Sequence, residues 1–176
     1  MSIHLRRANT GEYNTALEML HDAAAWLKSI HIDYWQVWLD PPENYVDWIR
    51  QGFDNGEFYF AQAEDGEVVG MLRLQYADEM FWGNREDKAG YIHSFTTSRK
   101  YKGRGIGCTI LTQIEAKLAG EGVEYLRLDC APHVEKLCAY YESYGFEAKE
   151  TVTVYGEELR LYEKNIVEKR GDLKRE

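Results

Sequence analysis

The sequence is poor in cysteine and short of basic residues. Three of its 176 residues are cysteine (Cys108, Cys130 and Cys138), an odd number whose spacing fits neither a disulfide framework nor a zinc site. Lys and Arg together number 21 against 30 Asp and Glu, which gives a formal net charge of −9. Because phosphate backbones and anionic lipids attract basic surfaces, this balance argues against nucleic acid and membrane as partners.

Long apolar runs are missing as well. The first ten residues, MSIHLRRANT, lack the apolar centre of a signal peptide, and no run approaches the ~20 apolar residues of a membrane span. Together with the unpaired cysteines, these absences predict a reduced, cytoplasmic protein that uses no metal.

The periodicity of the apolar residues predicts one mixed α/β domain over residues 1–165, followed by a charged tail over 166–176. Alternating patterns predict strands at 2–7, 57–64, 67–76, 90–97, 123–130, 146–155 and 158–164. Helical spacing predicts helices after Thr10, after Pro42, from the glycine loop to about 119, and over 134–144. Residues 78–88 are interpreted as a polar loop.

A glycine-rich stretch, YKGRGIG over 101–107, lies directly before an apolar-striped helix. Three glycines in five positions disfavour helix by roughly 1 kcal/mol each, so a ligand is the expected reason for them. Four cations lie at this stretch: Arg99 and Lys100 directly before it, and Lys102 and Arg104 within it. Because the first amides of a helix have no internal partner, the pattern predicts an anion site, most plausibly for phosphate. A Walker phosphate-binding loop would end in GK[ST], and a GxGxxG dinucleotide-binding motif would need its third glycine at position 108. The sequence has neither, so neither motif explains the stretch.

This loop closely resembles the acetyl-CoA-binding motif of the GNAT superfamily of N-acetyltransferases, [QR]xxGx[GA], which appears here as KGRGIG over 102–107. The resemblance extends to YIHSFTT before the loop and to LDCAPHVEKLCAYYESYGFE after it, and it covers about residues 3–164. It implies a mixed, mostly antiparallel sheet flanked by helices, with the fourth and fifth strands splayed apart.

The resemblance also implies how acetyl-CoA, the co-substrate, is bound. The pyrophosphate would lie on the loop amides, and the pantetheine arm would pair with the strand before the loop. The implied contacts are Phe95, Thr96, Thr97, Lys102, Gly103, Arg104, Gly105, Ile106, Gly107 and Cys108. Two positions depart from the family: Lys102 replaces the usual Gln or Arg but keeps the positive charge of Arg, and His133-Val134 stands where many members have an Asn.

Two residues are expected to carry the chemistry. Tyr141 matches the family's proton-donating tyrosine, although its helical spacing also suits a core aromatic. Asp129 is the first candidate for the base, although it also suits a solvated charge at a strand end. Glu79, His93 or a water chain remain alternatives for the base.

The acceptor pocket is expected near the aromatic segment 23–39, with Trp35 and Glu79 as acceptor contacts. Trp26, Tyr34, Trp35 and Trp38 form either a box for a cationic amine or part of the core. The resulting prediction is an N-acetyltransferase that moves the acetyl group from acetyl-CoA to a primary amine of a small molecule or peptide by direct attack. Three alternative functions stay open: a cofactor-binding module without turnover, transfer of a longer acyl group, and a partner-binding protein. Assembly as a homodimer is also left open.

Overall fold

The computed structural model describes residues 2–167, and within this range the chain forms seven strands and five α-helices. Most of the predicted tail, residues 168–176, lies outside the described residues. The chain divides into two compact units. The first contains residues 1–74 and 94–111, and the second contains residues 75–93 and 112–176.

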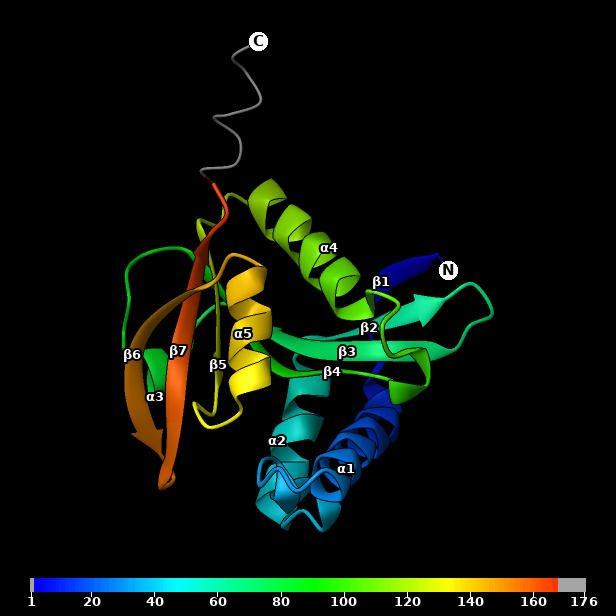
Figure 1. Ribbon diagram of the computed structural model, residues 1–176. Coiled ribbons are helices and arrows are strands. Elements are labelled where there is room, and N and C mark those ends of the chain that lie inside the picture. The colour runs from blue at the N-terminus through cyan, green and yellow to red at the C-terminus, as the bar shows by residue number, and fades with distance from the viewer. Residues whose placement is uncertain (1, 168–176) are drawn as a thin grey trace. The chain divides into compact units, whose positions relative to one another are not determined.

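The first unit is built on an antiparallel meander of β1 (Ile3–Arg7), β2 (Phe58–Ala63) and β3 (Val68–Gln75). A tight turn through Asp65-Gly66 joins β2 to β3. Helices α1 (Tyr13–Ser29) and α2 (Glu43–Asp54) lie side by side (Figure 1). Their apolar faces and the strands form one core, because the buried side chains of Leu20, Ile49, Phe53 and Phe60 cluster there.

The second unit holds the remaining strands in the order β4-β5-β7-β6. β4 (Ala89–Thr97) pairs in parallel with β5 (Tyr125–Cys130), whereas β7 (Glu157–Asn165) is antiparallel to both β5 and β6 (Glu147–Val154). Helix α5 (Glu135–Ser143) covers one face of these strands and the short α3 (Glu79–Trp82) the other (Figure 1). Helix α4 (Ile106–Gly120) buries the predicted stripe Ile106, Ile110, Ile114 and Leu118.

The predicted splay of the fourth and fifth strands is confirmed. β4 and β5 pair only from Ala89↔Tyr125 to Tyr91↔Arg127, although both strands continue beyond these residues. Shortly afterwards Ser94 adopts φ +52°, a left-handed conformation that a non-glycine residue seldom takes inside a strand. Such outliers concentrate at functional sites, where the surrounding structure maintains them.

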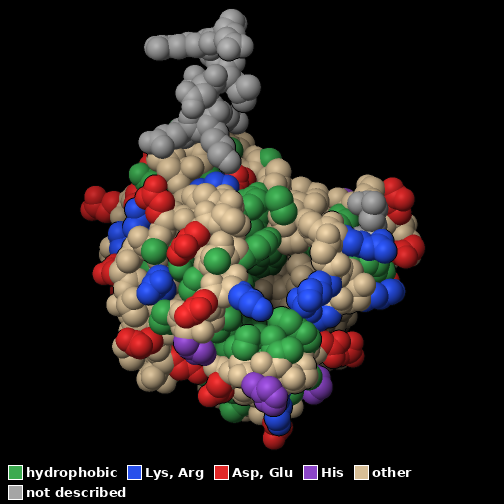
Figure 2. Space-filling model, viewed as in Figure 1, with side chains coloured by type: hydrophobic (Ala, Val, Ile, Leu, Met, Phe, Trp, Pro, Cys, Tyr) green, Lys and Arg blue, Asp and Glu red, His purple; other side chains and the backbone are tan. Residues whose placement is uncertain are grey.

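Two local expectations need correction. The segment 78–88 is not only a polar loop, because it contains α3, whose Trp82 is buried. The helix expected after Thr10 begins only at Tyr13, because Thr10 opens a 3-10 turn, which Asn9 and Glu12 cap reciprocally. No helix in the described range is long and apolar enough to cross a membrane. On the face shown in Figure 2, Lys and Arg side chains are interspersed with Asp and Glu.

Candidate active site

The glycine loop of the first unit has a backbone that needs its glycines. Gly103 and Gly105 have φ of +78° and +71°, where an L side chain is strained. A Cβ at either position would meet no heavy atom within 4 Å, so backbone conformation rather than crowding requires the glycines. The carbonyl of Gly105 accepts the Thr109 amide at 2.9 Å, which starts α4 directly at the end of the loop.

The four cations of the loop are not equivalent. Arg99 stacks on Trp26, with its Cζ 3.6 Å from the ring centroid, and Lys100 Nζ pairs with Glu67 Oε2 at 2.7 Å. Lys102 and Arg104 are exposed and take part in no ion pair of the described residues. Lys102 and Arg104 therefore offer positive charge to an anion at this loop, and Arg99 keeps its charge while it stacks on Trp26.

The aromatic side chains of segment 23–39 differ in burial: some are packed in the core and others are partly exposed. Trp38 is buried in the core and meets Tyr45 edge-on, with centroids 5.5 Å apart. Trp35 is half-buried, stacks on Tyr34 at 5.6 Å and has φ +61°. Trp38 is thus part of the core, and Trp35 as an acceptor contact stays a prediction.

Asp129 lies near the end of β5, in the second unit, among apolar neighbours. Its antiparallel partner on β7 is Leu161, which is fully buried. Burial raises the pKa of the Asp129 carboxyl to about 6; His93 acts to lower it, and the charge of Asp78 adds to the rise. A carboxylate with this pKa titrates close to neutral pH, as a general base requires.

His93 is not a lone strand histidine. Its Nε2 lies 2.9 Å from Asp78 Oδ2, and the exposed fractions of the two side chains are 10% and 7%. Phe81 packs against the imidazole, with ring centroids 5.2 Å apart. Sequence reasoning missed Asp78, which lies fifteen residues before its partner in the segment interpreted as a loop.

His93 and Asp129 interact electrostatically within the second unit. Tyr91 and Arg127 form the last pair before β4 and β5 diverge, and His93 and Asp129 each follow two positions later, on the same face of their own strands. The charge of His93 acts on the pKa of Asp129, as does the charge of Asp78. Direct contact between the side chains of Tyr91 and Arg127, at 2.9 Å, shows that matched residues share this face. Asp78, His93 and Asp129 therefore form one group of ionisable side chains, called the acidic cluster below.

Tyr141 lies on the other face of these strands. It is buried in α5 and packs against Phe146 and Tyr162, with centroids 5.9 and 6.1 Å away. Cys138 of the same helix lies 3.5 Å from Cys130, sulfur to sulfur, and Cys130 points to the face opposite Asp129 because strand residues alternate. The structure thus does not bring Tyr141 and Asp129 together on one face; they flank the sheet from its two sides.

Comparison with known proteins identifies the family. A model of the "Acetyltransferase (GNAT) family" matches residues 21–146, which is more than half of the chain. The chain belongs to the GNAT acetyltransferase family. It is therefore an acyltransferase by descent, and the fold expected from the motif is the fold observed.

Individual relatives agree with this assignment. An aminoglycoside N(6')-acetyltransferase type 1 from Stenotrophomonas maltophilia is 25% identical over 134 residues, covering 76% of this chain and 86% of that protein. A GNAT-family acetyltransferase crystal structure from Listeria monocytogenes 4b F2365 is similar with a TM-score of 0.76 and 26% identity, covering 93% and 94% of the two chains. The PaiA N-acetyltransferase from Thermoplasma acidophilum, solved with coenzyme A, shares the fold at 20% identity and a TM-score of 0.67, covering 94% and 99%.

Glu79 occupies an edge position in this acetyltransferase. It is the exposed first residue of α3 and, with Asp78 and Arg85, helps to line a cavity of about 100 Å³. The cavity opens beside the acidic cluster because Asp78 belongs to both. Glu79 as an acceptor contact stays a prediction.

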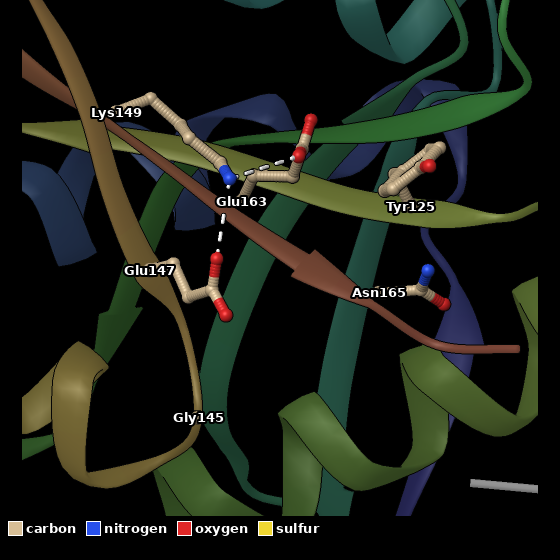
Figure 3. Close-up of a pocket in the computed structure, with 6 residues that line it drawn as sticks. All are labelled: Tyr125, Gly145, Glu147, Lys149, Glu163 and Asn165. Atoms are coloured by element: carbon tan, nitrogen blue, oxygen red, sulfur yellow. Dashed lines mark hydrogen bonds and ion pairs between the residues drawn. The ribbon is translucent and has the colours of Figure 1, made fainter. Parts of the chain in front are cut away.

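A larger cavity of about 250 Å³ contains none of the predicted site residues. It lies over β5, β7 and β6 (Figure 3), where Lys149 Nζ reaches between Glu147 Oε2 at 3.2 Å and Glu163 Oε1 at 3.5 Å. Tyr125 and Asn165 complete the lining at the other end. Its charged groups are already paired with one another, so the larger volume does not indicate the reactive site.

Proposed function

We propose that the protein transfers the acetyl group of acetyl-CoA to a primary amine. The observation that carries the proposal is the glycine loop, where Gly103 and Gly105 hold left-handed conformations directly before α4. Family membership supports the same reaction class.

The residues present suit acetyl-CoA, which would supply the activated acetyl group as a thioester. The amides at the start of α4 have no acceptor within the helix and lie at the positive end of its dipole. Lys102 and Arg104 add charge for the phosphates. The residues proposed to contact the co-substrate are those predicted from the motif, Phe95–Thr97 and Lys102–Cys108.

Two proton transfers accompany the reaction. The acceptor must lose a proton before it can attack, and Asp129 is proposed to take it. The departing thiolate must gain a proton, and Tyr141 is proposed to give it from the opposite face of the sheet. The pairing of β4 and β5 ends after Tyr91, and this supports a reaction that passes between the two strands.

The acceptor is proposed to be a cationic small-molecule amine. Asp78 and Asp129 give the acidic cluster an excess of negative charge that favours an ammonium group. The similarity to an aminoglycoside N(6')-acetyltransferase supports a polyamine-like or amino-sugar acceptor. A peptide amine is the alternative, and the assay below separates the two.

Thermal unfolding with excess acetyl-CoA tests the co-substrate site. Ligand at 100 times its dissociation constant adds about 2.7 kcal/mol, which raises the melting temperature by roughly 5–10 °C at this size. Gly105→Val should abolish this rise. Gly156→Val in the β6–β7 turn is the matched control, since Gly156 also has a positive φ (+82°) and open space around its Cβ. Both substitutions strain the backbone, but the control should keep the ligand-induced rise.

Turnover is measured as acceptor-dependent release of the coenzyme A thiol, with amino sugars, polyamines and short peptides as acceptors. Release with cationic small amines supports the proposed acceptor class, and release with peptides alone contradicts it. Ligand-induced stabilisation without release for any amine would indicate a binding module, and no stabilisation at millimolar acetyl-CoA would overturn the proposal.

A further inference from the structure

Asp78 and His93 form a carboxylate–imidazole pair to which the two proton transfers proposed above assign no role. The carboxylate is held at both oxygens: Oδ2 by His93 Nε2 at 2.9 Å and Oδ1 by the amide of Phe81 at 3.4 Å. Both side chains are almost buried, and buried polar groups are costly unless they are paired. The pair is therefore fixed in place by α3 and β4 together.

This pairing determines which ring nitrogen of His93 can accept a proton. An ionised carboxylate only accepts hydrogen bonds, so Nε2 must carry the hydrogen that is donated to Asp78. In the neutral imidazole the other nitrogen, Nδ1, then holds the lone pair. Asp78 thereby selects the tautomer in which Nδ1 is the basic atom.

The groups that face His93 place it beside a second carboxylate. Asp78 precedes α3, Asp129 follows Arg127 by two residues on β5 and is influenced by the charges of His93 and Asp78, and Tyr91 and Arg127 lie one step back along the strands. Arg127 is already bound to Asp87 and Glu163. The acidic cluster therefore carries two carboxylates and one imidazole, and its negative charge favours the uptake of a proton.

We propose that Asp78 and His93 complete a proton relay that begins at Asp129, an inference that rests on the acyl transfer proposed above. Asp129 takes a proton from the acceptor ammonium and becomes a carboxylic acid. It passes this proton to Nδ1 of His93 and returns to the carboxylate form. The resulting imidazolium is stabilised by Asp78, which acts as a positioning residue.

The relay conserves protons over the whole reaction. The acceptor ammonium gives its first proton to the relay, and the nitrogen that has gained the acetyl group loses a second. The sulfur of coenzyme A gains one proton through Tyr141, and one proton in total is released to water. The C–N bond that forms replaces the C–S bond that breaks, and no oxidant or reductant is needed.

The first test uses the protein without any ligand. Nitrogen-15 spectra of the histidine side chains should show His93 protonated at Nε2 above pH 8, and Asp78→Asn should reduce the share of this tautomer. Asn keeps the oxygen that caps α3, so the fold should survive. Carbon-13 titration of Asp129 should give a midpoint that rises in His93→Gln and falls in Asp78→Asn, because these neighbours act on it with opposite signs.

The second test is kinetic. His93→Gln should lower kcat about 10²- to 10⁴-fold with an unchanged KM for acetyl-CoA, the loss typical of a missing acid–base group. Asp78→Asn should lower kcat less, about 10- to 100-fold, and both variants should change the acidic limb of the pH–rate profile. His4→Gln, on the exposed part of β1, is the matched control and should behave as the wild type.

The outcomes separate this inference from the proposed function. A His93 protonated at Nδ1, an Asp129 midpoint indifferent to both substitutions, or a His93→Gln variant with activity within threefold of the wild type from pH 6 to 9 would overturn the relay alone. A wild type that is stabilised by acetyl-CoA but turns over no amine would overturn both. If His93→Gln fails to fold, Asp78→Asn decides by the same readouts.

Discussion

Two polar clusters lie one step apart on the same face of β4 and β5, and they balance charge in opposite ways. In one, Arg127 donates to Asp87 Oδ1 and Glu163 Oε2 at 2.8 Å and to the Tyr91 hydroxyl at 2.9 Å. In the other, the acidic cluster, one imidazole pairs with Asp78 and acts electrostatically on Asp129. We call the first the arginine cluster.

The difference separates an ion network whose charges are compensated from one whose carboxylate has a pKa close to neutral pH. Burial opposes the charge of Arg127, but hydrogen bonds to Asp87, Glu163 and Tyr91 outweigh it, so the pKa of the guanidinium is raised. The same bond lowers the pKa of Asp87. In the acidic cluster, by contrast, burial of Asp129 dominates and brings its pKa to about 6. Where each buried charge has a partner of opposite sign, the protonation states do not change near neutral pH. Where negative charge is in excess, a carboxylate can gain or lose a proton in that range.

The largest effect should come from breaking the arginine cluster. Arg127→Met leaves carboxylates without their partner and should lower the free energy of unfolding by about 3–5 kcal/mol. Urea unfolding followed by tryptophan fluorescence measures this loss. Arg85→Met is the control, because Arg85 is about one-third exposed and pairs with Glu150 at 3.3 Å, a pair expected to contribute less than about 1 kcal/mol. Equal losses in both variants would mean that the arginine cluster is not a structural network.

A smaller effect of the opposite sign is expected in the acidic cluster. The folded-state pKa of Asp129 is raised, so its charge destabilises the folded protein, and this penalty develops as the pH rises from about 4 through about 6. Asp129→Asn should therefore raise the melting temperature by about 5–10 °C at pH 8 and hardly at all at pH 4.

The same variant should lose acetyl transfer, as expected of a residue that favours activity at the expense of stability. Scanning calorimetry at the two pH values, combined with the thiol-release assay, measures both effects. A variant that melts lower than the wild type at pH 8 would show that Asp129 is structural.

The smallest effect should come from the exposed edge of the arginine cluster. Asp87 is 33% exposed, so Asp87→Asn should cost only about 0.5–1 kcal/mol at pH 7. Because the pKa of Asp87 is lowered in the folded protein, this cost should shrink as the pH falls below the ordinary value of about 4 and vanish once the pH has passed the lowered pKa. Urea midpoints at pH 7 and pH 3 measure the change, and a cost that is undiminished at pH 3 would point to packing rather than charge.

The elements of the fold were largely predictable because they depend on local patterns. Gly103 and Gly105 are enough to predict the glycine loop, and the helical spacing of the apolar residues predicts the buried stripe of α4. Helix α3 was not predictable, since four residues are too few to show a period. Its capping residue, Asp78, followed by Glu79, is the one local signal that could have indicated it.

The acidic cluster was predictable only in part. Asp129 was found because it ends a strand next to the expected splay. His93 was only an alternative candidate for the base, because its partner Asp78 comes from the turn into α3 and no fixed sequence spacing indicates it. Arg127 was overlooked for a similar reason: a charged residue in a strand appears solvated until Asp87 and Glu163 are seen beside it.

The three cysteines differ in a way that matters for handling the protein. Cys108 is exposed as the third residue of α4, whereas Cys130 and Cys138 are buried, and burial raises the pKa of the Cys130 thiol. Thiol reagents need an accessible thiolate. A maleimide dye added to the folded chain would therefore attach beside the glycine loop, so the natural sequence already provides an optical probe for the arrival of a ligand there.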